Sequence, residues 1–196
     1  MRKIRVLDNV YDLITINMED RFKDNVAFRF YDTANDAVTT ILYKDYVQDI
    51  RKAVNYFQST IPEIKGKKIC LLTKNSYEYA VNTFGVVAAG AVLVLLNQRK
   101  SWDELSYELG LVEPDAILTD GDDYGFNDQL KAAYGDILRP IDGFRSYEPA
   151  QLTRCIDHEA LMVLMFTSGT TGRSKGVMLS EKNFFSVMRA HTQIGE

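Results

Sequence analysis

The chain has 196 residues, 46% of them hydrophobic, which suffices for one domain with a proper core. Its formal net charge of −4 argues against a nucleic-acid partner, because phosphate backbones require clustered basic side chains. There is no signal-peptide pattern, and the longest uncharged apolar run, 84–96, is too short to cross a bilayer. We therefore expect a cytoplasmic protein without a transmembrane segment. Cys70 and Cys155 form no CxxC or Cys/His set, which fits a reducing compartment.

The first sixty residues have the patterns of a scaffold rather than of a site. Apolar residues recur at helical spacing in two segments, and two short alternating segments between them flank a polar turn. The predicted elements are a helix over 10–22 capped by Asp8 or Asn9, a hairpin of strands over 26–31 and 37–42, and a helix over 44–58.

In the middle of the chain, short apolar runs alternate with helical patterns. The predicted strands are 67–73, 91–96 and 115–119, and the helices between them are 75–89 and 101–110. Each helix begins at a capping-box pattern, Asn75 with Glu78 and Ser101 with Glu104, and Gly90 and Gly110 are expected to end them. This alternation predicts an α/β fold in which helices cover both faces of a parallel sheet.

The signal weakens between 120 and 159. The run DGDDYG suggests calcium, but it lacks the twelve-residue ligand spacing of an EF-hand, so we interpret it as a solvated loop. A short helix over 127–134 and a strand over 137–141 are expected before a connector, 143–159. Neither His158 nor His191 has a nucleophile elbow or an HExxH pattern, so neither is a catalytic candidate.

The segment from Met165 to Val177, MFTSGTTGRSKGV, has the clearest chemistry. Its small and hydroxylated residues let the backbone approach a ligand closely, and Lys175 adds an ammonium group, so the segment suits a polyphosphate. A Walker A loop is excluded, because Ser174 precedes this lysine and Gly176 follows it. An ordinary flexible surface loop is the competing interpretation.

The flanks of this segment also have a pattern. The apolar run 160–166 predicts a buried strand before the loop, which disfavours the surface-loop interpretation. After the loop we expect a short strand over 176–179 and a helix from Glu181, capped by Ser180.

The sequence FTSGTTGRSKGVMLS resembles the signature phosphate loop of the AMP-forming acyl/aryl-CoA synthetase superfamily, the adenylate-forming enzymes. Two further segments, ILYKDYVQDI and FGVVAAGAVLVLLNQRKSWDELSYEL, are similar to other blocks of that family, so the likeness covers most of 25–196. Family members usually have proline where this chain has Ser174. Many have histidine where it has Glu181, and we carry no histidine role over to Glu181.

The resemblance implies a fold and an activity. Residues 1–196 would be the N-terminal portion of the AMP-binding domain, with the rest of the large domain and a C-terminal domain absent, and this piece alone is expected to be inactive. The complete enzyme would form an acyl-adenylate from ATP and a carboxylate and pass the acyl group to coenzyme A. ATP would be bound here, and Mg²⁺ and coenzyme A mainly outside this chain. By resemblance, the ATP-phosphate-binding residues are Thr167, Ser168, Gly169, Thr170, Thr171, Gly172 and Lys175, with no catalytic residue or metal ligand in this chain.

The resemblance implies one reaction and several candidate acids. The sequences of the loop and of the DELSYEL block resemble those of fatty acyl-CoA ligases more than those of peptide-synthetase adenylation domains. A long- or medium-chain fatty acid is therefore the first expectation. The alternatives are an adenylation domain that loads an aryl or amino acid onto a carrier protein, and a catalytically silent ATP-binding or interaction module. The oligomeric state stays open, a homodimer included.

Overall fold

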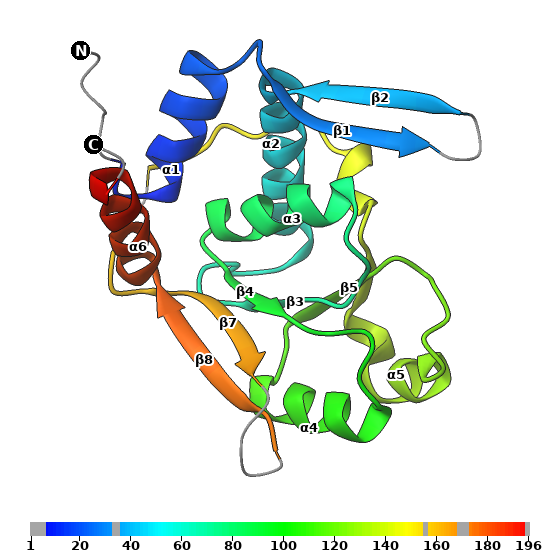
Figure 1. The fold of residues 1–196 in the computed structure, drawn as a ribbon. Helices are drawn as coiled ribbons and strands as arrows, with labels where there is room; N and C mark the ends of the chain where they lie inside the picture. The colour runs from blue at the N-terminus through cyan, green and yellow to red at the C-terminus, as the bar shows by residue number, and fades with distance from the viewer. Residues whose placement is uncertain (1–6, 33–35, 155–156, 168–172, 195–196) are drawn as a thin grey trace.

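The computed structural model describes residues 7–32, 36–154, 157–167 and 173–194. They form an α/β fold around a six-stranded sheet of order β6-β5-β3-β4-β7-β8 (Figure 1). The strands are β3 (Lys68–Leu71), β4 (Val92–Leu95), β5 (Ala116–Thr119), β6 (Leu138–Pro140), β7 (Leu161–Thr167) and β8 (Lys175–Ser180). The predicted parallel sheet holds for β3 to β7, whereas β8 pairs antiparallel with β7. The segment 168–174 between them is much shorter than the dozen or so residues that a parallel crossover needs.

Helices cover both faces of this sheet, and each face has its own core (Figure 1). On one face lie α2 (Tyr43–Thr60) and α3 (Tyr77–Ala88), and on the other lie α4 (Trp102–Val112) and α5 (Asn127–Tyr134). The two-sided arrangement explains why the central strands are apolar throughout. Cys70 of β3 is fully buried, and burial raises the pKa of its thiol.

The N-terminal part packs on the α2 side. The predicted hairpin is confirmed as a separate two-stranded sheet of β1 (Val26–Asp32) and β2 (Ala37–Leu42). The predicted first helix begins as α1 (Val10–Asp12), capped by the Asn9 side chain, which accepts a hydrogen bond from the Asp12 N–H at 2.7 Å.

This first helix differs from the expectation in its geometry, because it continues as a π-helix over Leu13–Arg21. Its buried residues Val10, Ile14 and Met18 recur every four positions. Residues four positions apart lie on one face of a helix, so these three side chains reach the same core.

Helix ends were predicted with mixed success. The capping box of Ser101 and Glu104 at α4 is confirmed, and Gly90, at φ +84°, ends α3 as expected. The N-cap of α3 is Ser76, not Asn75: its hydroxyl accepts the Tyr79 N–H at 3.1 Å. Gly110 does not end α4 either.

Helix α4 continues past Gly110 because a residue of its last turn packs into the core. Val112, two residues after Gly110, is buried in the core on this face of the sheet, and the helical turn that contains it continues to that residue. The helix ends at Val112, and its C-cap is Glu113, which has a left-handed φ of +51° and precedes Pro114.

Between 120 and 159 the predicted helix is confirmed as α5, and the predicted strand is confirmed in the shorter form of β6. Two 3₁₀ turns were not predicted, Gly135–Ile137 and Gly143–Ser146. The second lies in the expected connector, where Phe144 is fully buried in the core that contains α2.

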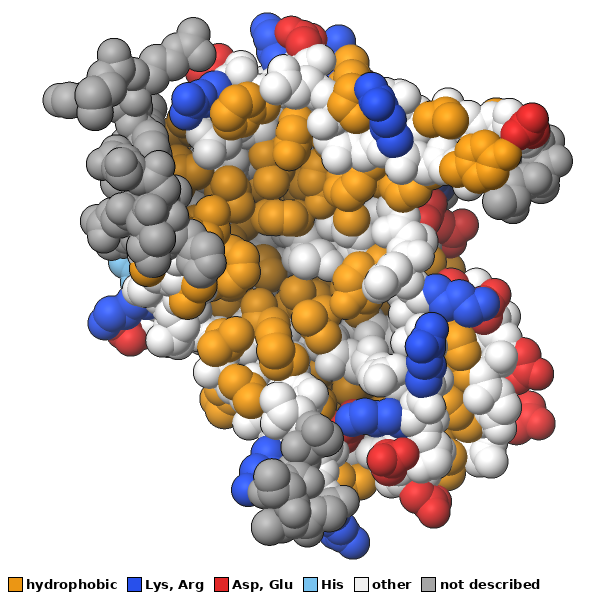
Figure 2. Space-filling view, viewed as in Figure 1, with side chains coloured by type: hydrophobic (Ala, Val, Ile, Leu, Met, Phe, Trp, Pro, Cys, Tyr) orange, Lys and Arg blue, Asp and Glu red, His pale blue; other side chains and the backbone are white. Residues whose placement is uncertain are grey.

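One face of the molecule is strongly apolar. Figure 2 shows hydrophobic side chains gathered from the hairpin across α3 towards β7 and β8. Among the large hydrophobic residues that are exposed are Tyr31 and Val38 of the hairpin and Met178 of β8, at 61%, 61% and 65%. Large exposed apolar patches usually mark a surface that meets another part of a protein or a partner. Within the described part of the chain, every helix is too short or too polar to span a membrane.

Candidate functional site

The two strands that flank the predicted phosphate loop form its stems. Thr167, the last residue of β7, lies opposite Lys175, the first residue of β8, in the antiparallel register. Both are exposed, so a hydroxyl and an ammonium group flank the entrance and exit of the loop. The other predicted site residues, Ser168, Gly169, Thr170, Thr171 and Gly172, lie outside the described residues.

The position of these stems in the sheet favours ligand binding. Strand β7 pairs parallel with β4, and the loop leaves β7 at its carboxyl end. In open α/β sheets, ligands bind in the crevice outside the carboxyl ends of the strands. Met162 and Val163 are buried, so β7 is fixed in the core before it reaches Thr167.

Two further cations lie at the stems, and neither was predicted as a site residue. The Arg173 guanidinium lies 4.8 Å from the centroid of the Tyr107 ring. The Lys100 ammonium forms an ion pair with the Glu108 carboxylate and lies 5.9 Å from the centroid of the Phe166 ring. The sequence contained a signal for both, because Arg173 lies inside the motif and Lys100 follows the strand that pairs with β7.

The described residues suit the phosphates of a nucleotide better than a bare metal ion. Thr167 supplies a hydroxyl, and Lys175 and the exposed Arg173 supply positive charge. Phosphate oxygens accept hydrogen bonds from hydroxyl groups and form charge-assisted hydrogen bonds with lysine and arginine side chains. No group of three or more His, Cys, Asp or Glu side chains in the described ranges could hold a metal ion.

Another polar cluster follows β5, where the calcium interpretation was considered. The Asp120 carboxylate accepts hydrogen bonds from the Tyr124 hydroxyl at 2.6 Å and from the Lys74 N–H at 2.9 Å. Burial raises the pKa of Asp120, but these hydrogen bonds outweigh it and hold the pKa below its usual value. Asp122 is ion-paired with Lys74. These carboxylates therefore hold the loop together through protein donors.

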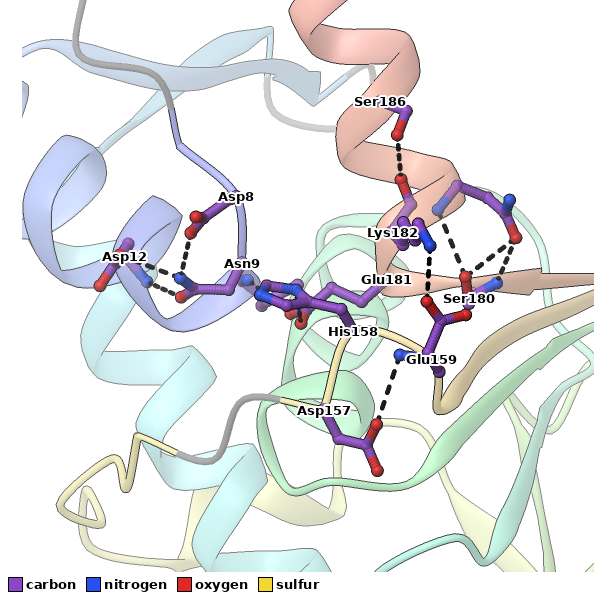
Figure 3. Close-up of polar contacts among 12 residues, drawn as sticks. Asp8, Asn9, Asp12, Asp157, His158, Glu159, Ser180, Glu181, Lys182 and Ser186 are labelled. Atoms are coloured by element: carbon purple, nitrogen blue, oxygen red, sulfur yellow. Dashed lines mark hydrogen bonds and ion pairs between the residues drawn. The ribbon is translucent and has the colours of Figure 1, made fainter.

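Glu181, the first residue of α6 (Glu181–Ile194), connects distant parts of the chain (Figure 3). Its Oε1 accepts the backbone N–H of Val10 at 2.9 Å, and its Oε2 lies 3.4 Å from Nδ1 of His158. The predicted cap of this helix is confirmed, since the Ser180 hydroxyl accepts the Asn183 N–H at 3.3 Å. Glu181 thus joins the first helix, the segment before β7 and the end of β8.

Comparison with known proteins shows to which family the chain is related. Residues 18–196 match the family model described as AMP-binding enzyme. A 2-succinylbenzoate–CoA ligase of Bacillus cereus is 30% identical over 122 residues, 62% of this chain and 24% of that protein. The 4-coumarate–CoA ligase-like 2 protein of Arabidopsis thaliana is 26% identical over 151 residues, 65% of this chain and 26% of that protein. The chain therefore spans about a quarter of the length of these relatives.

Solved structures have the same fold. ATP-bound MatB from Rhodopseudomonas palustris aligns with a TM-score of 0.75 at 24% identity, over 92% of this chain and 36% of that one. O-succinylbenzoate coenzyme A synthetase (MenE) from Bacillus subtilis, in complex with AMP, aligns with a TM-score of 0.74 at 21% identity, over 93% of this chain and 46% of that one. At these identities the alignments establish the fold.

Proposed function

We propose, since this chain belongs to the AMP-binding enzyme family, that the complete protein activates a carboxylic acid with ATP and transfers the acyl group to coenzyme A. In the first step a carboxylate oxygen attacks the α-phosphorus of ATP, which gives the acyl-adenylate and releases pyrophosphate. In the second step the coenzyme A thiol attacks the acyl carbon, and AMP leaves. The observation that carries the proposal is the hydroxyl- and glycine-rich loop whose stems bring Thr167 opposite Lys175.

The loop residues are assigned to the β- and γ-phosphates. Their hydroxyl and backbone N–H groups donate to phosphate oxygens, and the Lys175 ammonium offsets the charge. Each charge-assisted contact is worth on the order of 1.5–3 kcal/mol. The assigned residues are Thr167, Ser168, Gly169, Thr170, Thr171, Gly172 and Lys175.

We further assign residues 1–196 to the N-terminal portion of the AMP-binding domain of a cytoplasmic enzyme. The length of the matched relatives and the exposed apolar face described above support a larger domain that packs against this portion. Adenine, Mg²⁺, the acyl group and coenzyme A would then meet residues mainly outside this chain. The 196-residue chain alone is expected to release no AMP from ATP, carboxylate and coenzyme A.

Two acid classes compete as the substrate. The wording of the loop favours a long- or medium-chain fatty acid, whereas the matched relatives are named for 2-succinylbenzoate and 4-coumarate, both aromatic acids. Those names favour an aromatic acid as the second candidate, and the substrate test must include both. An adenylation domain that serves a carrier protein, and a silent ATP-binding module, stay as alternatives to the coenzyme A ligase.

The test is carboxylate-dependent exchange of labelled pyrophosphate into ATP by the complete native protein, with fatty, aryl and amino acids as separate substrates. Exchange with one class supports adenylation and identifies the acid, and acyl-CoA formation then separates a coenzyme A ligase from a carrier-loading domain. A folded protein that binds ATP but shows no exchange with any acid would contradict the proposal and favour the silent module.

A further inference from the structure

Helix α4 and the residue just before its N-cap contact both stems of the phosphate loop. On the entrance side, the Lys100 ammonium lies 5.9 Å from the centroid of the Phe166 ring, and Phe166 directly precedes Thr167. On the exit side, the Tyr107 ring lies 4.8 Å from the Arg173 guanidinium, two residues before Lys175. Figure 1 shows α4 next to the loop end of β7 and β8. Side chains of α4 and of Lys100 therefore contact a side chain on either side of the loop.

A buried carboxylate, that of Glu108, forms an ion pair with the Lys100 ammonium of the entrance contact. Glu108 of α4 is fully buried, and Lys100 keeps only 19% of its side chain exposed. Burying both charges removes them from water, so such a pair adds little stability over an apolar pair of similar size. The second oxygen of Glu108, Oε2, has no hydrogen-bond partner among the described residues, which makes its burial costlier still. The pair therefore has little value for stability, but it fixes the position of the Lys100 ammonium.

The exit contact restrains a side chain that would otherwise be free to move. Arg173 is exposed, and a long exposed side chain in water has many rotamers. The face of an aromatic ring attracts a guanidinium and favours one position for it. Tyr107 is half-buried and adjacent to Glu108 in the sequence, so the two contacts originate from consecutive residues of α4.

We propose that α4 and Lys100 position the two stems of the phosphate loop for ATP through these contacts, with Lys100, Glu108 and Tyr107 acting as positioning residues. The entrance contact fixes the stem at Phe166, and the exit contact fixes the stem at Arg173. Thr167 follows Phe166 directly and Lys175 lies two residues after Arg173, so fixed stems hold the Thr167 hydroxyl and the Lys175 ammonium in place and lower the ordering cost of binding phosphates. The ATP part of this inference rests on the proposed function, and the restraint on the stems does not.

Kinetics of the complete native protein test the exit contact. Tyr107→Leu is expected to raise KM for ATP about three- to tenfold with little change in kcat or in KM for the acid. Tyr107→Phe keeps the ring face and is expected to restore the native KM for ATP. The double variant Tyr107→Leu with Arg173→Gln should be little worse than Arg173→Gln alone, because both changes remove one contact. Arg21→Gln, which removes a similar contact to Phe22 at 5.0 Å, is the matched control.

The entrance contact needs a variant that separates position from stability. Lys100→Met alone leaves a buried unpaired carboxylate and is expected to destabilise the protein. Lys100→Met combined with Glu108→Met removes both charges, so the melting temperature should recover while KM for ATP stays raised. If KM for ATP recovers together with the melting temperature, the entrance contact is only structural. If Tyr107→Leu leaves KM for ATP unchanged, or if its effect adds fully to that of Arg173→Gln, the exit contact has no positioning role.

Native-state proteolysis tests the restraint without any enzymatic activity. Trypsin must accept the Arg173 side chain, so cleavage after Arg173 should be several times faster in Tyr107→Leu than in the unchanged protein. Tyr134→Leu, which alters a half-buried tyrosine on α5, is the control. Equal cleavage rates would overturn the inference. A protein without pyrophosphate exchange would refute the proposed function, and the cleavage rates would still decide whether α4 restrains the stems.

Discussion

The carboxylate of Glu181 accepts the backbone N–H of Val10 at 2.9 Å, across 171 positions of sequence. Glu181→Ala leaves this N–H without its acceptor, so we expect a loss of about 1–3 kcal/mol in the free energy of unfolding. Glu181→Gln keeps an acceptor oxygen and should lose less. Urea unfolding measures both, with Lys182→Ala as control, because the Lys182 side chain lies in an exposed ion pair with Glu159, and such pairs add little stability. A loss for Glu181→Ala no larger than for the control would mean that the hydrogen bond between Val10 and Glu181 adds no stability.

Two glycines predict opposite effects of the same substitution. A Cβ at Gly85 on α3 would lie 2.5 Å from the Cβ of Ala53 on α2, so Gly85→Ala should cost about 1–3 kcal/mol of stability by overpacking. A Cβ at Gly110 would meet nothing within 4 Å, and in the interior of α4 an alanine should stabilise by about 0.5–1 kcal/mol.

Thermal or urea unfolding of both variants checks this pair of predictions. Ala53→Gly combined with Gly85→Ala moves the methyl group from one helix to the other and should recover part of the loss. A Gly85→Ala variant without loss of stability would contradict the close approach of α2 and α3, and a destabilising Gly110→Ala would contradict the open space around Gly110.

The pair of Glu78 and Arg145 predicts a dependence of stability on pH. Arg145 Nη2 donates to Glu78 Oε1 at 2.5 Å. Burial raises the pKa of Glu78, but the Arg145 hydrogen bond and further hydrogen bonds outweigh it, so the pKa lies below its usual value. A carboxylate whose pKa is lower in the folded state stabilises above the unfolded pKa, about 4.3 for Glu, and loses this contribution as pH falls through the folded pKa.

We therefore expect Glu78→Gln to reduce stability at pH 7 by a small amount, about 1 kcal/mol or less, because Arg145 is half-exposed. The difference from the unchanged protein should shrink below about pH 4.3. Urea unfolding from pH 7 to pH 3 measures it. In an Arg145→Gln background the difference should be smaller throughout, and a difference that does not change with pH would exclude this ion pair as its source.

Sequence patterns predicted the local features of the fold and missed those decided by distant contacts. The capping box of Ser101 and Glu104 is a bond between near neighbours, so the sequence contained it in full. The end of α4 depends on the burial of Val112, so the prediction that Gly110 ends this helix was wrong. The antiparallel direction of β8 could have been inferred from the length of the loop, since no short segment can join parallel strands.

The candidate site divides in the same way. Its motif, with Thr167 and Lys175, could be predicted because these residues lie in one continuous segment, and the structure pairs the two across β7 and β8. The pairing of Lys100 with Glu108, and of Tyr107 with Arg173, joins segments that the fold brings together. The sequence indicates that Lys100 and Arg173 are cations close to the motif or to the strand beside it. Only the packing of α4 beside β7 and β8 identifies Glu108 and Tyr107 as their partners.

Lys175 gives the most direct test of the phosphate assignment. Because the exposed Lys175 ammonium has no carboxylate partner among the described residues, we expect it to be available to phosphate, and Lys175→Ala should weaken ATP use by the loss of one charge-assisted contact, about 10- to 150-fold in KM for ATP. Lys175→Arg keeps the charge and should lose less. The measurement is the ATP dependence of pyrophosphate exchange in the complete native protein, with circular dichroism to verify folding. Lys182→Ala, on the same side of the loop in sequence, should leave KM for ATP unchanged. An ATP dependence that Lys175→Ala does not alter would remove the assignment of this loop to the phosphates.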